Sequence, residues 1–459
     1  MNLTRRNFIK SGLFFSTGIL GLKNFTDLKI EKSSFYGNLK KDPNKLLDLP
    51  EGFSYKIISE SGNIMNDGFL VPGAMDGMGS FYGGEGISIL VRNHENLPSD
   101  FSRSPFGQNN SLYSKIDKNK LYDEGISGMP CTGGTTTIIY DTKNRIVLQE
   151  SISLVGTLRN CAGGSTPWNT WITCEEVAVK KGYKLHDQDI DGLKKNHGYN
   201  FEVPVSKDIK ITTPKPLKAM GRFRHEAVSV DPKTGIIYQT EDRSEGLIYR
   251  FIPEKKENLD KGKLQVLCLK EKGVKDTRNW EDSKTKIPKN KEFETYWIDV
   301  RDPENPEDKM RFEMHEKGAA IFARSEGMWY GNDEIYFACT EGGPKKLGQI
   351  FRYKPSKYEG AEKENKNPGK LELFIESTDK EILQHADNIT VSPKGHLICC
   401  EDAGSDSSIV GINQEGQIYK IADLNENTEL AGSCFSADGT TLFVNAQWTG
   451  KTLAITGPW

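Results

Sequence analysis

Paired residues that could bind cations recur along the chain at nearly constant spacing. The pairs are Cys161 and Glu176, Glu226 and Glu241, Glu326 and Glu341, and Asp387 and Glu401. The first three share the same interval, and the last is shorter by a single position. A strand of about six residues, a tight turn and a second strand of equal length bring the chain back to its starting end. Each pair is therefore predicted to lie at one end of its own hairpin.

Carboxylates gathered at one end of several hairpins would repel one another, and multivalent cations remove that penalty. Oxygen ligands favour calcium, whereas a thiolate such as Cys161 beside carboxylates favours a transition metal. Asp242, which follows Glu241, and Glu95 extend the candidate set. The spacing thus predicts a cation-binding centre. The alternative is that these acids merely end strands at a solvated surface.

Arg324 lies within the same series, shortly before Glu326. An arginine presents a planar fork of donors that fits a pair of phosphate or carboxylate oxygens. Arg324 is therefore a candidate for binding an anionic substrate, with Arg243 as a second candidate. The alternative is an ion pair between Arg324 and the acidic residues themselves.

The segments that must position these side chains have the pattern of β-hairpins. Residues 225–230 and 236–240 flank a turn that contains Pro232 and Gly235. Residues 389–391 and 396–400, and residues 434–436 and 441–444, repeat this arrangement. Quasi-repeated hairpins with little helical periodicity indicate an all-β chain built as a β-propeller. The length predicts six blades with loop insertions, at about 70 residues a blade.

Residues 1–25 have the layout of an export signal. Arg5 and Arg6 precede Phe8-Ile9-Lys10 and a mildly apolar run that is too short to span a membrane. Paired arginines in this position resemble a twin-arginine signal. We expect residues 1–25 to be this signal and residues 40–459 to form a single catalytic propeller domain. A short N-terminal helix that packs on the fold is the alternative.

Composition excludes several classes of protein. The 459 residues hold 61 Lys and Arg against 64 Asp and Glu, a net charge of −3, which argues against nucleic acid as a partner. The chain has no apolar stretch long enough for a membrane span. Eight scattered cysteines are too few for a disulfide framework. Residues 187–192 resemble the start of a calcium-binding loop that lacks its final glutamate.

Seven short motifs, in their order along the chain, resemble those of the PhoX-type alkaline phosphatases. They are Arg92-Asn93-His94-Glu95, Asn160-Cys161-Ala162-Gly163-Gly164, Thr173-Cys174-Glu175-Glu176, Arg224-His225-Glu226-Ala227, Thr240-Glu241-Asp242-Arg243, Ala323-Arg324-Ser325-Glu326-Gly327 and His385-Ala386-Asp387-Asn388. The resemblance implies a six-bladed propeller with a cluster of two Fe³⁺ and several Ca²⁺ ions at the mouth of its channel. It also implies an enzyme, expected to be a monomer, that hydrolyses phosphate monoesters in the periplasm or outside the cell after export by the twin-arginine machinery.

The resemblance assigns roles to individual residues. Cys161 matches the thiolate ligand of iron, and Arg324 matches the arginine that binds phosphate, with help from Asn93. The matching carboxylate ligands are Glu95, Glu176, Glu226, Glu326 and Asp387. The spacing adds Glu241, Asp242, Glu341 and Glu401 as ligands, with no particular ion assigned to each.

Two other functions remain open at this point. A propeller hydrolase that uses calcium alone, such as a lactonase, would contain no iron and no metal-bound Cys161. A binding propeller without catalytic activity would hold no metal, and its carboxylates could be removed without effect on any reaction rate. The acidic residues predicted at one end disfavour the binding propeller, because protein-binding rims are usually mixed in charge and rich in aromatic residues.

Overall fold

The computed structural model of the protein describes residues 35–126, 128–183 and 192–459. The expected export signal at residues 1–25 and the calcium-type loop at residues 187–191 lie outside these ranges. Within them, strands β1–β26 make up most of the regular structure, with α1 (Met310–Glu316) as the α-helix. No helix among the described residues is long and apolar enough to cross a membrane.

Antiparallel sheets account for all 26 strands of the described ranges. One sheet runs from β4 (Met75–Tyr82) through β5 (Ile87–His94) and β6 (Gly133–Asp141) to β7 (Ile146–Thr157). The next contains β8 (Asn160–Ser165), β9 (Thr170–Glu175) and β10 (Asn200–Pro204). A third joins β24 (Leu430–Phe435), β25 (Thr441–Ala446), β26 (Lys451–Thr456) and β3 (Ser54–Glu60).

Two larger sheets complete the set. The six-stranded sheet orders β20 (Ala386–Val391), β21 (Leu397–Glu401), β22 (Ser408–Ile412), β23 (Ile418–Leu424), β2 (Leu47–Pro50) and β1 (Leu39–Lys40). The nine-stranded sheet orders β11 (His225–Val230), β12 (Ile237–Glu241), β13 (Ile248–Lys255), β14 (Asn258–Leu269), β15 (Glu292–Asp299), β19 (Lys370–Glu376), β18 (Gln349–Lys354), β17 (Glu334–Cys339) and β16 (Ser325–Gly331).

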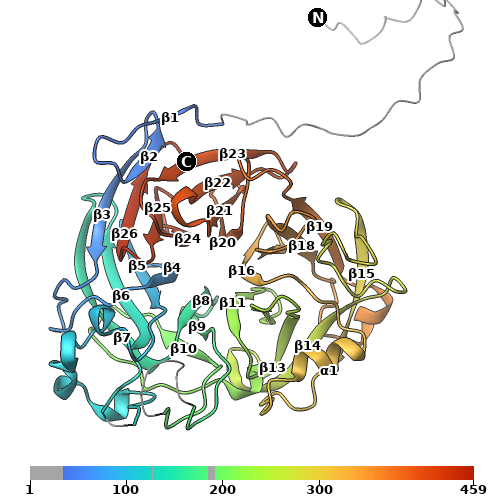
Figure 1. Cartoon of the computed structure of the whole chain (residues 1–459), viewed down its shortest axis with the longest axis horizontal. Coiled ribbons are helices and arrows are strands. Elements are labelled where there is room, and N and C mark those ends of the chain that lie inside the picture. The colour runs from blue at the N-terminus through green and yellow to red at the C-terminus, as the bar shows by residue number, and fades with distance from the viewer. Residues whose placement is uncertain (1–34, 127, 184–191) are drawn as a thin grey trace, which may run out of the picture. The chain divides into compact units, whose positions relative to one another are not determined.

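The sheets are arranged around a centre, as the blades of a propeller are (Figure 1). The innermost strands contact one another in a closed ring, in the order β4, β8, β11, β16, β20, β24 and back to β4. β3 pairs with β26, so a strand from the start of the described chain completes a sheet from its end. This pairing joins the two ends of the described chain in one sheet and so helps to close the ring. The predicted all-β, propeller-like fold is confirmed.

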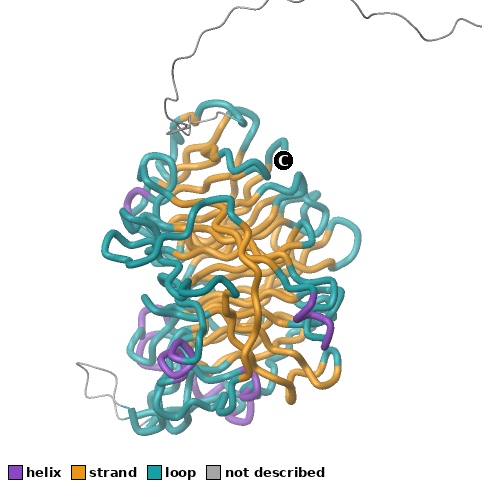
Figure 2. Tube along the Cα trace, turned by 90° about the vertical axis from the view of Figure 1, so that its right-hand side faces the viewer, coloured by secondary structure: helices purple, strands orange, loops and turns teal. Residues whose placement is uncertain are grey.

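Short 3₁₀-helices and loops connect the strands. The 3₁₀-helices are η1 (Phe101–Arg103), η2 (Gln108–Asn110), η3 (Tyr113–Lys115), η4 (Lys118–Lys120), η5 (Lys218–Met220), η6 (Glu362–Lys366) and η7 (Gly404–Asp406). Figure 2 shows strands through the middle of the view with loops at both sides. The loops therefore lie at the strand ends, where functional side chains are expected.

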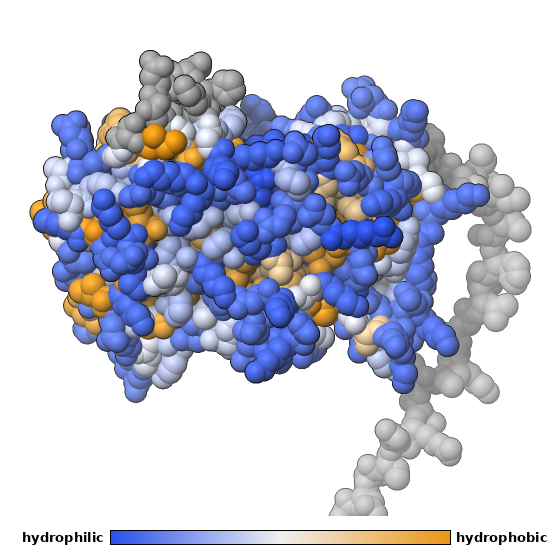
Figure 3. Space-filling model, turned by 90° about the horizontal axis from the view of Figure 1, so that it is seen from below, coloured by the Kyte–Doolittle hydropathy of each residue, from blue (hydrophilic) through white to orange (hydrophobic). Residues whose placement is uncertain are grey.

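Apolar side chains between neighbouring sheets form the core. Phe337 stacks on Phe351, and both meet Phe322 edge to face, with ring centroids 5.2–5.3 Å apart. All three rings are fully buried. Such pairs add to the burial of apolar area and fix the packing of the sheets that carry the inner strands. The face in Figure 3 is mostly hydrophilic, with small scattered apolar areas.

Candidate metal centre

The inner strands share one irregularity near the start of each. Where β4, β8, β11, β16, β20 and β24 meet their second strands, two residues of the inner strand oppose one residue of its partner. This arrangement is a β-bulge, which re-aims a side chain and is common beside active sites. The first bulge residues are, in chain order, Asp76, Cys161, Glu226, Glu326, Asp387 and Gly432.

The second bulge residue is small in every inner strand except β20, where it is Asn388, and the neighbouring inner strand lies against it at Gly77 and Gly327. A Cβ atom on Gly77 would lie 2.5 Å from the Cα of Ala162, in the bulge of the next inner strand. A Cβ on Gly327 would lie 2.4 Å from the carbonyl oxygen of Asp387. The bulges thus pack against one another, and this contact directs their first residues to a common place.

The second strands of the hairpins contribute the residue that follows the last ladder pair. These residues include Glu95, Glu176, Asp242, Asp402 and Gln447. For the four acids, the preceding residue pairs with the residue just before the bulge, as His225 pairs with Glu241 and Ala386 with Glu401. Gln447 differs, because Ala446 pairs with Leu430, two positions before the bulge of β24. Successive side chains of a strand point to opposite faces. Of two consecutive residues such as Glu241 and Asp242, only one can therefore face the centre.

Cys161 lies at the junction of several acidic side chains. Its Sγ is 2.9 Å from Oε1 of Glu226 and 3.3 Å from Oδ2 of Asp76. Gln447 donates through Nε2 to Oδ2 of Asp76 at 2.7 Å and to Oε2 of Glu95 at 2.9 Å. These five side chains come from four different sheets, and all are buried.

Three arginines lie along the acidic groups. Arg324 pairs with Asp242 through Nε at 2.9 Å and with Glu326 through Nη2 at 2.7 Å. Arg159 bridges Glu95 and Glu176, and its Nη2 lies 2.7 Å from Oε2 of Glu176. Arg224 pairs with Glu176 and lies 3.5 Å from Asp242.

The arginines are more accessible than their partners. Between 26% and 31% of each arginine side chain is exposed, against 1–6% for the paired carboxylates. An anion that approaches from solvent therefore meets guanidinium groups before it meets carboxylates.

At this centre, four groups of side chains have ligand atoms close enough together to hold an ion. They are Asp76, Glu95 and Cys161; Cys161, Glu176 and Glu226; Glu226, Glu326 and Asp387; and Asp387, Asp402 and Glu429, with the ligand atoms in each group within 4.8 Å of one another. Consecutive groups share Cys161, Glu226 or Asp387, so together they form one continuous cluster. We call this set the central cluster.

Two buried oxygens of the central cluster lack a hydrogen-bond partner, Oε2 of Glu226 and Oδ1 of Asp387. A buried carboxylate oxygen without a donor is costly, so a buried acid of this kind normally has a partner of some sort. A cation supplies that partner. The donor set of one thiol and many carboxylates fits a mixed cluster of transition-metal and calcium ions.

Burial and crowding raise the pKa values of these acids. Burial and the charge of Glu176 raise the pKa of Asp76 to about 7, although the hydrogen bond from Cys161 acts in the opposite direction. The pKa of Glu176 is raised to about 8 by burial and by Glu95. For Glu226, Glu326 and Asp387 the pKa is raised well above its usual value by burial and by neighbouring carboxylates.

The pKa of Asp242 is shifted in the opposite direction, and the pKa of Cys161 decides whether its sulfur is a thiol or a thiolate. Burial opposes ionisation of Asp242, but Arg324 and Arg224 outweigh it and lower the pKa of this carboxyl. The pKa of the Cys161 thiol is raised well above its usual value by burial and by the charges of Asp76 and Glu226. Cys161 is thus a thiol in the metal-free protein, and a bound cation is needed to favour the thiolate.

The structure brings most of the predicted residues together and separates three of them. Glu95, Cys161, Glu176, Glu226, Glu326 and Asp387 lie in the central cluster, with Asp242 and Arg324 beside it. Glu241 instead accepts from Tyr249 Oη at 2.8 Å and from the Leu247 amide. Glu401 accepts from the Gln384 amide, and Glu341 belongs to none of the candidate ion-binding groups of described residues.

Asn93 is buried and committed to the scaffold. Its Nδ2 donates to the carbonyls of Cys161 and Ala162, and its Oδ1 accepts from Nε1 of Trp171. These contacts hold the bulge that carries Cys161. The second arginine candidate, Arg243, pairs with Asp308 outside the central cluster.

Six residues at this site were not predicted as site residues from the sequence: Asp76, Asp402, Glu429, Arg159, Arg224 and Gln447. A signal for Asp76 was present, because Asp76-Gly77 repeats the order of a ligand and a small residue found in Glu226-Ala227 and Glu326-Gly327. A consistent interval would also have selected Asp402, which follows Asp387 at the same distance along the chain as Glu176 follows Cys161.

The chain is similar to known proteins in family and in fold. A family model described as alkaline phosphatase PhoX matches residues 34–450. The solved structure of Pseudomonas fluorescens PhoX in complex with vanadate, a transition state analogue, is 18% identical, with a TM-score of 0.67 over 90% of this chain and 96% of that one. A streptogramin B lyase structure is 11% identical over 88% and 98% of the chains, with a TM-score of 0.40. No curated protein sequence matches the chain.

Proposed function

Because the chain belongs to the alkaline phosphatase PhoX family, we propose that the central cluster holds the iron and calcium ions with which this phosphomonoesterase hydrolyses its substrates. The observation that supports this most strongly is the convergence of Cys161 and carboxylates from neighbouring inner strands on one buried place. The products are inorganic phosphate and an alcohol or phenol.

The donor types divide the cluster between the two kinds of ion. Cys161 would hold iron together with the acids grouped around it, Asp76, Glu95, Glu176 and Glu226. The groups that contain only carboxylates, from Glu226 through Asp387 to Glu429, would hold calcium. When bound, these cations supply the positive charge that stabilises the transition state of phosphoryl transfer.

The chain's own residues bind and orient the substrate. Arg324 presents its guanidinium at the accessible side of the cluster, already aligned by Asp242 and Glu326. This planar fork would bind two non-bridging oxygens of a phosphate monoester. Arg159 and Arg224 add positive charge at the same side and would draw the dianion toward the cluster. Asn93 would act indirectly, by fixing the strand that carries Cys161.

We further propose that the fold is a six-bladed propeller formed by residues 40–459. The closed ring of innermost strands supports this count, with the nine-stranded sheet counted as two blades joined through the pairing of β15 with β19. The twin-arginine pattern at residues 1–25 supports export to the periplasm or beyond. Replacing Arg5 and Arg6 by lysine should keep the protein in the cytoplasm, as cell fractionation would show.

The central test is phosphate release from an aryl phosphate by the purified, metal-loaded protein. We expect turnover that is lost on chelation and restored by iron with calcium. Restoration by calcium alone, with no iron in the native protein, would instead support a calcium-dependent hydrolase. Absence of turnover with both metals restored and measured in the protein would contradict the proposed function.

A further inference from the structure

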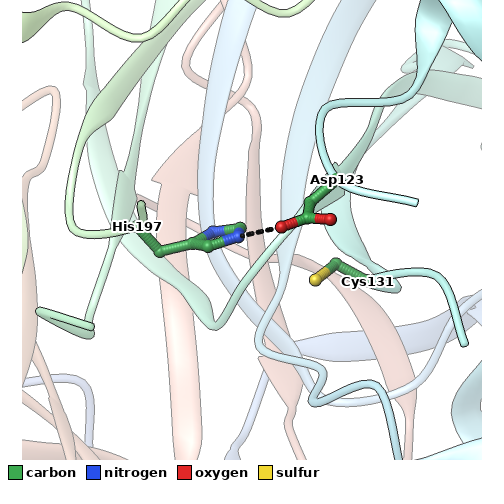
Figure 4. Close-up of side chains that lie close together, drawn as sticks. All are labelled: Asp123, Cys131 and His197. Carbon is green, nitrogen blue, oxygen red and sulfur yellow. Dashed lines mark hydrogen bonds and ion pairs between the residues drawn. The ribbon is translucent and has the colours of Figure 1, made fainter. Parts of the chain in front are cut away.

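A second group of metal-type side chains lies apart from the central cluster. Asp123 and Cys131 belong to the segment between η4 and β6, and His197 lies just before β10. Figure 4 shows the His197 ring and the Asp123 carboxylate pointing toward one another, with Cys131 beside them. This group shares no residue with the central cluster.

The separation of the ligand atoms suits a single ion. Oδ2 of Asp123 lies 3.2 Å from Nε2 of His197, and the sulfur of Cys131 is within 4.8 Å of both. Two ligands that are each about 2.0 Å from a tetrahedral zinc ion lie about 3.3 Å apart. The distance between Asp123 and His197 is therefore that expected of two ligands on one ion.

The orientation of His197 is set by Glu175. Nδ1 of His197 lies 2.6 Å from Oε1 of Glu175, which also accepts from the backbone amide of Leu158 at 3.0 Å. A carboxylate that receives one ring N–H fixes the tautomer and leaves the other nitrogen free to bind metal. The free nitrogen, Nε2, is the one that faces Asp123.

Asp123 is held in place by backbone groups. Its Oδ1 accepts from the Gly125 amide and its Oδ2 from the Lys195 amide, each at 2.8 Å. The Cys131 amide in turn donates to the Asp123 carbonyl at 3.1 Å. The Asp123 carboxylate and the backbone of Cys131 are thus held in place by the chain itself.

The burial and the negative charge of the residues around His197 favour a bound cation. Asp123, Cys131, Glu175 and His197 are all completely buried, so two carboxylates flank one imidazole without contact with solvent. Two buried negative charges need a compensating positive charge. A proton on His197 would also supply it, but the presence of the Cys131 sulfur among these groups favours a metal ion. A nucleophilic role for Cys131 does not fit, because its side chain is out of reach of a substrate.

We propose that Asp123, Cys131 and His197 bind a structural transition-metal ion of the zinc type. Thiolate, imidazole and carboxylate are all zinc ligands, whereas calcium takes oxygen ligands alone. The ion would tie the segment before β6 to the segment before β10. Through Glu175 it would also fix the end of β9, where the next residue, Glu176, enters the central cluster.

Anomalous diffraction at the zinc edge tests this on the unaltered protein, crystallised as purified and again with added zinc. We expect a peak between Asp123 Oδ2 and His197 Nε2. If no peak is found there with zinc present, His197 is an imidazolium held between two carboxylates and the proposal is wrong. The result does not depend on phosphatase activity, so it stands apart from the test of the proposed function.

Elemental analysis of a variant provides the second test. Cys131→Ser should lose one equivalent of zinc per chain and keep its iron. The matched control is Cys174→Ser, which alters another buried cysteine that lies on β9 beside Glu175 and should keep its zinc. An unchanged zinc content in Cys131→Ser would refute the assignment. If that variant does not fold, the diffraction experiment on the unaltered protein decides.

Discussion

The sulfur of Cys161 lies 2.9 Å from Oε1 of Glu226, although the two residues are far apart in the chain. Cys161 occupies the bulge of β8 and Glu226 the bulge of β11, the next inner strand of the ring. The same bulge in successive strands thus converts a repeated hairpin into a set of converging ligands. The following predictions depend on this arrangement.

Substitution of Cys161 should remove iron from the central cluster. Cys161→Ser replaces the soft sulfur ligand by a hydroxyl, and we expect metal affinity and turnover to fall by about 100-fold or more, in line with the loss of a metal ligand or its support. Elemental analysis and phosphate release measure the two effects. Cys399→Ser, at a buried cysteine outside every candidate ion-binding group of described residues, should keep its iron. Full iron content in Cys161→Ser would exclude Cys161 as a ligand.

Removal of Arg324 should weaken phosphate binding while metals stay bound. A charge-assisted hydrogen bond contributes about 1.5–3 kcal/mol, so Arg324→Ala should raise the inhibition constant of phosphate by about 10- to 100-fold. Arg352→Ala is the control, because Arg352 pairs with Glu372 on β19 rather than with the central cluster. Unchanged phosphate inhibition in Arg324→Ala would show that Arg324 serves only as an ion-pair partner of Asp242 and Glu326.

The metal-free and metal-loaded proteins should respond to pH in opposite directions. The folded-state pKa of Glu176 is about 8 and that of Asp76 about 7, both above their unfolded values near 4. Between these values the metal-free folded chain holds more protons than the unfolded chain, so its free energy of unfolding falls as pH rises from about 4 to 8. Metal binding needs deprotonated ligands, so bound metals become more stabilising as pH rises.

Thermal unfolding of chelated and metal-loaded samples between pH 4 and pH 8 measures how the stability of each form changes with pH. The same change with pH in both forms would contradict the assignment of Glu176 and Asp76 as ligands.

A single neutral substitution should stabilise the metal-free protein and impair the loaded one. Glu226→Gln removes a buried carboxyl whose ionisation is opposed by burial and by neighbouring acids and whose Oε2 has no hydrogen-bond partner, so the melting temperature of the metal-free form at pH 8 should rise. Calcium and iron binding should weaken in the same variant. Glu254→Gln, at an exposed position of β13, is the control and should change neither property. A lower melting temperature in metal-free Glu226→Gln would show that the Glu226 carboxyl does not destabilise the metal-free protein.

The contact between bulges should be sensitive to one methyl group. Gly77→Ala places a Cβ 2.5 Å from the Cα of Ala162. The atoms nearest to this Cβ all belong to the backbone of Cys161 and Ala162, which cannot move aside as a flexible side chain can. We expect a loss of about 1–3 kcal/mol in unfolding free energy, together with weaker metal binding. Gly62→Asn is the control: nothing lies within 4 Å of the added Cβ, so any stability lost there comes from its positive φ alone, and its metal content should be unchanged. Normal stability and metal content in Gly77→Ala would show that the inner strands can separate without cost.

Local sequence chemistry predicts much of the fold. Turn residues such as Pro232 and Gly235 mark the hairpin of β11 and β12 because they favour the required backbone angles, and the β-branched runs around them favour strands. The spacing of Glu226, Glu326 and Cys161 likewise follows from hairpin length, and this was enough to expect them at one end of the sheets.

Register and packing between sheets decided the rest. Glu241 was as good a candidate as Asp242, and Glu401 as good as Asp402, until the strand ladders showed which residue follows the last pair. A shift of one residue turns a side chain to the opposite face, and a repeat in sequence does not specify that shift. The order of residues alone identifies the hairpins that carry acids. Which of those acids meet depends on the bulges, which pack against one another around a closed ring.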